Sequence, residues 1–151
     1  MNRDLQKICE NRGNKKIIFT NGCFDILHSG HVQYLNEAKS LGDILVVGLN
    51  SDRSVKDLKG PLRPINSEKD RKFILENLKS VDFVEIFDQP TPLELIQNVR
   101  PDILVKGGDW KVEQIVGSDF VISHGGLVRS LVFKEGQSTT NIIEKIKEAD
   151  H

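Results

Sequence analysis

The sequence predicts an α/β fold built around a parallel β-sheet. Short apolar runs alternate with segments that carry apolar residues at helical spacing, which is the pattern of βαβ units. The run 44–49 is almost entirely apolar, as expected for a strand that helices cover on both faces. With 151 residues and a hydrophobic content of 38%, we expect residues 1–151 to form one domain.

Five strands and five helices are expected in alternation. The strand-like runs are rich in β-branched and aromatic residues, and they cover 16–20, 44–49, 83–87, 103–105 and 127–133. The helical patterns cover 31–41, 67–78, 91–99, 118–124 and 141–149. Ser67 and Ser118 are expected caps, and Thr91 is a capping residue that places Pro92 at the first helical position.

The polar segment 50–66 contains Gly60-Pro61 and Arg63-Pro64. We expect it to be the longest irregular connection. Long connections in compact domains are often functional, so this segment is a candidate lid.

Composition excludes several classes of function. The chain carries 21 Lys and Arg against 22 Asp and Glu, and its pI near 6.4 argues against a nucleic-acid binder. No apolar run is long enough to span a bilayer, and Met1–Asp4 leads into no signal-peptide core. Cys9 and Cys23 form no CxxC motif. We therefore expect a cytoplasmic protein with reduced thiols and neither nucleic acid nor membrane as partner.

The densest chemical signal follows the first expected strand. His28 and His31 flank Gly30 where a helix is expected to begin. A helix N-terminus offers unpaired N–H groups and partial positive charge, and the glycine lets a phosphate approach the backbone. The pattern predicts an anion site with two imidazole donors. A metal site and a turn without function are the alternatives, but no Glu or Cys stands near enough to complete a metal site.

Three further segments are candidates for ligand contacts. Seven basic residues lie in the segment from Arg53 to Lys72, and most are expected on a solvated face. A polyphosphate ligand would contact two or three of them, and we expect these to include Lys59 and Arg71. The glycines of Lys106-Gly107-Gly108-Asp109-Trp110, directly after the fourth expected strand, let a ligand ring lie against the backbone, unless this is a plain turn. Ser138-Thr139-Thr140 predicts either an ordinary helix cap or a second anion site.

These elements together resemble the cytidylyltransferase-like nucleotidyltransferases. The HxGH signature of that family corresponds to His28–His31, its G-x-F-D to Gly22–Asp25 and its late S-T-T to Ser138–Thr140. The resemblance implies a Rossmann-like three-layer sandwich with a central parallel sheet, of the HxGH nucleotidyltransferase type. It also implies ATP and a sugar phosphate as partners, Mg²⁺ as a cofactor and a homodimer.

Within that family, residues 17–146 are most similar to the adenylyltransferases that make ADP-heptose. No kinase-like segment precedes them here, which resembles a stand-alone form. The implied reaction transfers AMP from ATP to D-glycero-β-D-manno-heptose 1-phosphate, giving ADP-heptose and pyrophosphate. Residues 133–136 lack the Arg-Thr pair of glycerol-3-phosphate cytidylyltransferases. A cytidylyltransferase acting on glycerol 3-phosphate or another small phosphate, and a nucleotide-binding regulatory domain, are the alternatives.

The resemblance also implies roles for individual residues. The expected catalytic residues are His28, His31 and Lys59. The expected nucleotide contacts are Gly22, Cys23, Phe24, Gly30, Arg71, Gly107, Gly108, Asp109, Ser138, Thr139 and Thr140. The expected acceptor contacts are Asp25, Asn50, Asp52 and Arg63. Mg²⁺ is expected to be held by phosphates and water, so no protein metal ligand is named.

Overall fold

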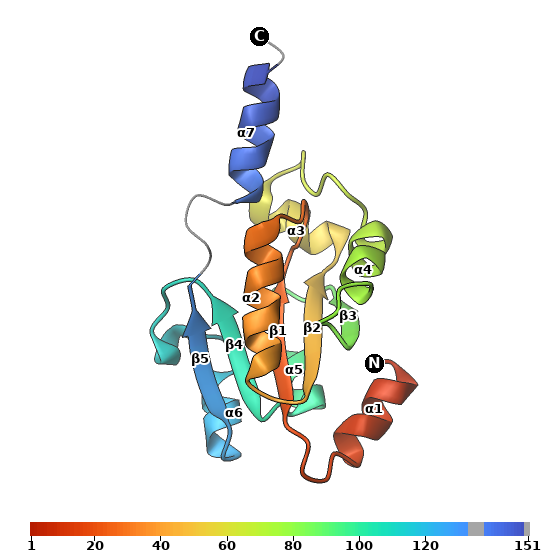
Figure 1. The fold of residues 1–151 in the computed structure, drawn as a ribbon, viewed down its shortest axis with the longest axis vertical. Helices are drawn as coiled ribbons and strands as arrows, with labels where there is room; N and C mark the ends of the chain where they lie inside the picture. Colours follow the sequence, from red (N-terminus) through yellow and green to blue (C-terminus); the bar gives the residue numbers. More distant parts are fainter. Residues whose placement is uncertain (133–137, 150–151) are drawn as a thin grey trace.

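Five parallel strands form the centre of the computed structural model, which describes residues 1–132 and 138–149. They lie in the order β3-β2-β1-β4-β5 (Figure 1), and all four neighbouring pairs are parallel. Their bounds are β1 Ile17–Gly22, β2 Ile44–Asn50, β3 Phe83–Phe87, β4 Ile103–Gly107 and β5 Leu127–Leu131. The expected parallel α/β sheet is confirmed. The fifth strand was expected over 127–133, and position 133 lies outside the described residues.

Helices cover both faces of the sheet. They are α1 Arg3–Glu10, α2 Ser29–Ser40, α3 Asp52–Lys59, α4 Glu68–Glu76, α5 Leu93–Val99, α6 Ser118–Ser123 and α7 Thr139–Ala149, with a 3₁₀ turn η1 at Val112–Gln114. Leu35 of α2 and Leu75 of α4 belong to one core cluster. Ile96 of α5 and Val121 of α6 belong to another, on the opposite face. The molecule is therefore the expected three-layer sandwich (Figure 1).

The apolar run of β2 lies in the interior of this sandwich. All seven of its residues are buried. Leu45 contributes to the α2 face and Val46 to the α5 face, in register with Ile18 and Phe19 of β1. Alternating side chains thus supply both cores, which is why the run shows no polar alternation.

The winding of the chain reverses between β1 and β4. The connections through α2 and α4 lie on one face, and those through α5 and α6 lie on the other. β1 therefore pairs with β2 on one side and with β4 on the other. Such a reversal leaves a crevice at the carboxyl ends of the strands, which is where ligands bind in open α/β sheets.

Two helices were not expected from the sequence. Segment 50–66 is not one irregular connection, because α3 occupies residues 52–59 and Ser51 caps it by accepting a hydrogen bond from the Ser54 N–H at 3.1 Å. This helix buries only Ser54 and Val55. Helix α1 buries only Leu5. Each of these helices has eight residues and buries only one apolar side chain, so the sequence offers few apolar positions by which to predict it.

Several expected helix starts shift by one or two residues. Helix α2 begins at Ser29 rather than at His31. Ser118 is not a cap, since Gly117 holds the N-cap position with φ 88° and Ser118 lies inside the first turn. Pro92 stands at the N-cap of α5 rather than at its first helical position.

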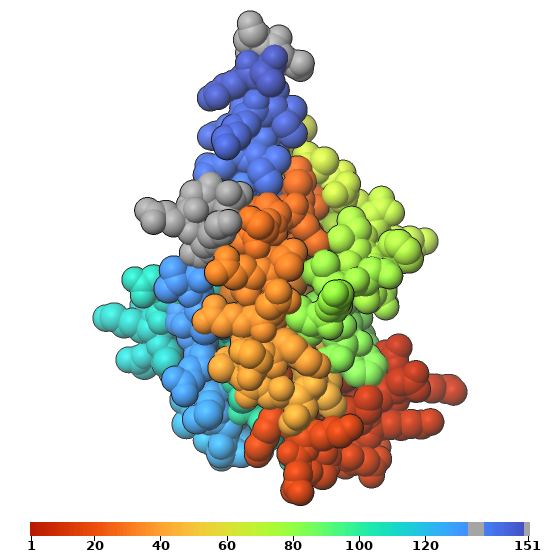
Figure 2. Space-filling view, viewed as in Figure 1, coloured from red at the N-terminus to blue at the C-terminus, as the bar shows by residue number. Residues whose placement is uncertain are grey.

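Helix α7 projects beyond the rest of the molecule (Figures 1 and 2). None of its described residues is buried. The hydroxyl of Thr139, in its first turn, donates to the backbone carbonyl of Ile26 at 3.0 Å, so the start of α7 lies against the turn that follows β1. None of the helices in the described ranges has the length and apolar character needed to cross a membrane.

Candidate active site

A cavity of about 420 Å³ opens at the carboxyl edge of the sheet. It lies where β1, β2 and β4 end, between α2 on one face and the loop before α5 on the other. Sequence-predicted residues that line it are Gly22, Cys23, Phe24, Asp25, His31, Asn50, Lys59, Arg63, Gly107 and Thr139. The fold thus brings together segments that are up to 117 positions apart in the sequence, from Gly22 to Thr139.

The HxGH motif forms the N-terminus of α2 as a reciprocal cap. His28 is the N-cap, and its Nδ1 accepts a hydrogen bond from the Gly30 N–H at 3.1 Å. His31, three residues later, accepts one at Nδ1 from the His28 N–H at 3.4 Å. The two rings lie with their centroids 4.0 Å apart. The spacing of three residues is the spacing of a capping box, with imidazoles in place of a hydroxyl and a carboxylate.

This geometry defines the tautomer of both rings. A neutral imidazole that accepts a hydrogen bond at Nδ1 carries its proton on Nε2. Burial lowers the pKa of His28. Burial, followed by the charges of His28 and Lys59, lowers the pKa of His31 to about 4. Both rings are therefore neutral at pH 7, and each can donate one Nε2–H hydrogen bond.

Phe24 has a strained backbone at the turn before α2. Its φ of 46° lies in the left-handed region, which non-glycine residues seldom occupy. The ring is 94% buried and lies 5.4 Å, centroid to centroid, from the ring of His31. A Cβ on Gly22 would stand 2.9 Å from this ring, so the glycine is required for the ring to sit where it does.

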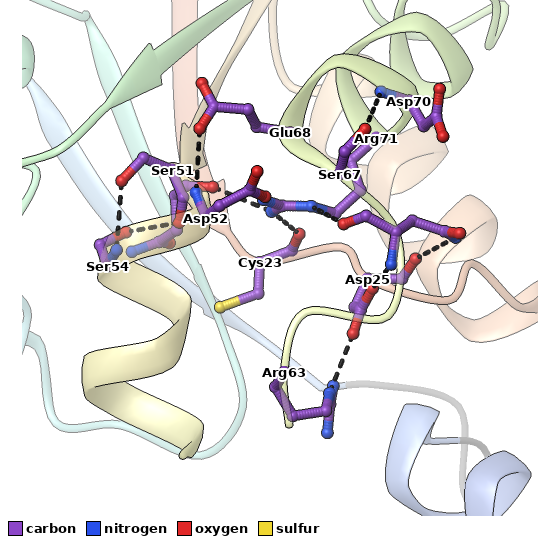
Figure 3. Close-up of polar contacts among 12 residues, drawn as sticks. Cys23, Asp25, Ser51, Asp52, Ser54, Arg63, Ser67, Glu68, Asp70 and Arg71 are labelled. Carbon is purple, nitrogen blue, oxygen red and sulfur yellow. Dashed lines mark hydrogen bonds and ion pairs between the residues drawn. The ribbon is translucent and has the colours of Figure 1, made fainter. Parts of the chain in front are cut away.

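Asp25 is occupied by contacts within the protein (Figure 3). Its buried carboxylate accepts hydrogen bonds from the backbone N–H groups of Ile65 and Asn66, at 2.8 and 2.9 Å. It also forms an ion pair with Arg63 at 2.9 Å. Asp25 thus links the segment after α3 to the turn after β1 and also lines the cavity, and its expected contact with the acceptor stays a prediction.

Arg71 is buried and is not among the residues that line the cavity; Figure 3 shows its contacts with protein groups. Its Nη1 donates to the carbonyls of Cys23 and Asn50, at 2.8 and 2.9 Å. Nε donates to the carbonyl of Asn66, and Nη2 pairs with Asp52 at 2.8 Å. The guanidinium has no exposed surface for a phosphate. The expected phosphate contact of Arg71 has no support from this arrangement and stays a prediction; Asp52, which accepts from the same guanidinium, does not line the cavity either.

Residues 19–145 match the family model described as cytidylyltransferase-like. The match covers the strands, the cavity and the HxGH turn. The chain belongs to the cytidylyltransferase-like family. The expected nucleotidyltransferase class is thereby confirmed.

Relatives of this cytidylyltransferase-like chain include bifunctional proteins. It is 58% identical over 146 residues to the bifunctional protein HldE of Campylobacter concisus, covering 97% of this chain and 30% of that protein. It is 55% identical over 143 residues to HldE of Helicobacter pylori, covering 95% and 30%. The chain therefore spans about a third of the length of the curated relatives it matches.

A solved structure has the same fold. It is described as the lipopolysaccharide core biosynthesis protein from Thermoplasma volcanium, and it superposes with a TM-score of 0.64 and 29% sequence identity. The superposition covers 82% of this chain and 100% of the other. The expected Rossmann-like fold is confirmed.

Some of the expected site residues do not line the cavity. They are His28, Gly30, Asp52, Arg71, Gly108, Asp109, Ser138 and Thr140. His28 and Gly30 still act on the site, because they form the cap that holds His31. Asp109 is exposed. Gly108 has a φ of 113°, and a Cβ there would lie 2.9 Å from the indole nitrogen of Trp110, so its glycine serves the packing of that side chain.

Other lining residues of this cytidylyltransferase-like site were missed in the sequence. They are Asn21, Tyr34, Leu58, Phe87, Pro90, Thr91, Pro92, Lys106 and Val116. Thr91 and Pro92 were interpreted only as helix caps, and Phe87 only as the end of a strand. Lys106 belongs to the candidate segment 106–110 but was given no role of its own, although a charged residue at the end of an apolar strand lies at the ligand-binding edge of a parallel sheet.

The described protein groups do not form a coordination set for Mg²⁺. No cluster of three or more His, Cys, Asp or Glu side chains suited to a metal occurs in residues 1–132 and 138–149. Asp25, the carboxylate in the cavity wall, is committed to Arg63 and two N–H groups. Mg²⁺ prefers oxygen ligands and commonly takes them from phosphates and water.

Proposed function

We propose that this chain transfers AMP from ATP to D-glycero-β-D-manno-heptose 1-phosphate, giving ADP-heptose and pyrophosphate. The observation that carries the proposal is the pair of neutral Nε2–H donors, His28 and His31, at the N-terminus of a 12-residue helix beside the cavity. Identity of 58% to a bifunctional HldE protein supports it. We further propose that residues 1–151 form one nucleotidyltransferase domain, active in the cytoplasm as a homodimer.

The reaction is an in-line displacement at the α-phosphorus of ATP. An oxygen of the sugar phosphate forms a new P–O bond there, the bond to the β-phosphate breaks, and pyrophosphate leaves with the electron pair. No covalent bond to the protein forms. Catalysis then consists of positioning and charge stabilisation.

The imidazoles and Lys59 stabilise the charge that develops at the α-phosphate. The Nε2–H groups of His28 and His31 donate to phosphate oxygens, assisted by the partial positive charge of the α2 N-terminus. Lys59, at the C-terminal end of α3, lines the same cavity and adds a positive charge between the α-phosphate and the attacking phosphate.

The remaining contacts follow from the cavity lining. Gly22, Phe24 and Gly107 offer surfaces for the nucleoside, while Asn50 and Arg63 face the acceptor. Ser138, Thr139 and Thr140 at the start of α7 would hold the leaving pyrophosphate. We propose that Mg²⁺ arrives with the nucleotide; when bound, it neutralises charge on the phosphates.

Pyrophosphate release by the purified chain tests this function. ATP or CTP is supplied with Mg²⁺, each with the heptose 1-phosphate or with glycerol 3-phosphate. The proposal requires release with ATP and the heptose phosphate. Release only with CTP and glycerol phosphate would overturn the substrate assignment, and silence with all four pairs would overturn the adenylyltransferase assignment itself.

A further inference from the structure

Lys106 places a positive charge at the cavity to which the proposed mechanism gives no role. It is the penultimate residue of β4, half-buried, and it lines the cavity next to Gly107. In the part of the chain that the structure describes, no carboxylate lies within ion-pair distance of its ammonium group. Arg63, by contrast, is paired with Asp25.

Trp110 holds Lys106 in this position. The Lys106 Nζ lies 5.6 Å from the centre of the indole ring, a geometry that favours a cation. The indole N–H donates to the Gly107 carbonyl at 3.1 Å, and the Trp110 backbone N–H donates to Ser130 at 3.2 Å. The loop after β4 is thus hydrogen-bonded to the end of β4 and to β5, and these bonds fix the indole ring beside Lys106.

The burial of Lys106 is incompletely compensated. Burial lowers the pKa of this lysine, because the charged form loses hydration. A contact with an aromatic ring replaces only part of that hydration. An anion bound beside Nζ would replace the rest, so the site favours a negatively charged ligand.

The position of Lys106 selects which anion it meets. Side chains alternate along β4, and Leu104 belongs to the α5 face while Val105 belongs to the α2 face. Lys106 therefore leaves the strand on the α5 face. His31 and Tyr34 line the cavity from α2, on the opposite face. The cavity therefore spans the sheet edge, with His31 lining it on the α2 side and Lys106 on the α5 side.

In-line displacement needs such an arrangement. The attacking group must approach the α-phosphorus from the side opposite the leaving group. If the phosphates of ATP lie at the α2 N-terminus, the acceptor enters from the α5 face. There Phe87, Pro90 and Pro92 provide apolar surface and Thr91 a hydroxyl, a lining typical of a small-molecule site.

We propose that Lys106 binds the phosphate of the acceptor sugar phosphate, the group whose oxygen attacks the α-phosphorus, and holds it on the α5 side of the cavity. This inference rests on the proposed adenylyl transfer and extends it to the acceptor side of the cavity. Trp110 acts as a positioning residue for Lys106.

Steady-state kinetics of Lys106→Met tests the proposal. Methionine keeps the length and apolar stem of the side chain but removes the charge. A lost hydrogen bond to a charged group predicts a rise of about 10- to 100-fold in KM for the heptose 1-phosphate, with KM for ATP changed less than about twofold. Lys106→Arg, which keeps the charge, should show a smaller rise. The matched control is Lys111→Met, an exposed lysine on the following loop, which should behave as wild type.

A second measurement uses the wild-type chain, so its result does not depend on whether the Lys106→Met variant folds. The Lys106 Cε signal is followed by NMR with α,β-methylene-ATP bound, before and after addition of the heptose 1-phosphate. The proposal requires the lysine pKa to rise when the sugar phosphate binds. An unchanged Lys106 titration, an unchanged acceptor KM in a folded Lys106→Met, or an equal rise in the KM of ATP would each overturn it.

The two proposals fail in different ways. A wild-type chain that releases no pyrophosphate from ATP and the heptose phosphate refutes the proposed function. The kinetic comparison of Lys106→Met is then made with whichever nucleotide and phosphorylated acceptor support turnover. An unchanged KM for that acceptor refutes the role of Lys106 alone.

Discussion

Asp25 and Arg63 connect two walls of the cavity through an ion pair of 2.9 Å between Oδ2 and Nε. The Asp25 side chain is 1% exposed and that of Arg63 is 15% exposed. Asp25 stands in the turn after β1, and Arg63 in the segment that links α3 to α4. The position of Arg63 in the cavity therefore depends on a carboxylate 38 residues earlier in the chain.

Asp25→Asn should destabilise the fold and weaken the attachment of the Arg63 segment to the turn after β1. Burial raises the pKa of Asp25, but the N–H groups of Asn66 and Ile65 and the Arg63 guanidinium outweigh it and leave the pKa below its ordinary value of 3.8. Lost charge-assisted hydrogen bonds predict a decrease of about 2–3 kcal/mol in the free energy of unfolding. Urea denaturation at pH 7 measures it, with the exposed Asp57→Asn as control.

The same variant makes a pH prediction. A carboxyl whose folded pKa is depressed stabilises the fold above its unfolded pKa and loses that effect as pH falls through the folded value. The stability difference between wild type and Asp25→Asn should therefore be largest above pH 4 and shrink below it. A difference that stays constant down to pH 2.5 would contradict the ionised state of Asp25.

His31→Ala should lower kcat far more than it lowers stability. One donor to developing charge is removed, which typically costs about 10²–10³ in rate, while the lost cap contact with the His28 N–H costs about 1 kcal/mol or less. Pyrophosphate release and thermal unfolding are measured together. His124→Ala removes an exposed histidine that contacts Phe120 at the end of α6 and should leave turnover unchanged. Near-normal turnover by His31→Ala would refute the phosphate contact.

The ligand-free protein should lose stability as pH falls from about 6.5 to 4. His31 has a folded pKa of about 4 against an ordinary value of 6.5, so the unfolded chain binds more protons in this window. The slope is at most about 1.4 kcal/mol per pH unit for this group. His31→Asn should flatten the dependence of the melting temperature on pH in that range, and an unchanged slope would show that His31 does not titrate with a depressed pKa.

Arg71→Met should be strongly destabilising. Three backbone carbonyls and Asp52 lose their donors inside the protein, which predicts a decrease of about 3–5 kcal/mol in the free energy of unfolding. Lys69→Met, two residues earlier and exposed, is the control. The KM of ATP for the folded fraction should stay within about threefold of wild type. A stable variant with a large increase in that KM would restore Arg71 as a phosphate ligand.

Local sequence patterns were sufficient to predict the parallel sheet covered on both faces and the position of the HxGH turn in the candidate site. The seven buried residues of β2 are apolar because both sheet faces are covered, and that property is visible in the run itself. His28 and His31 are three residues apart, and the cap they form involves only their own turn. Interactions of this range depend on neighbouring residues, so the amino-acid order was enough to place the motif at the start of a helix, although it did not predict the cap.

Only the tertiary structure decided which charged residues face the cavity. Arg71 in α4 and Lys106 in β4 both have cationic side chains. Arg71 is buried and donates hydrogen bonds to carbonyls up to 48 residues away, whereas Lys106 lines the cavity. Asp25 lines the cavity as expected, but its ion pair with Arg63 could not be predicted from the sequence. The partner of a long or charged side chain is set by contacts between distant segments, and these form only when the sheet brings those segments to one edge.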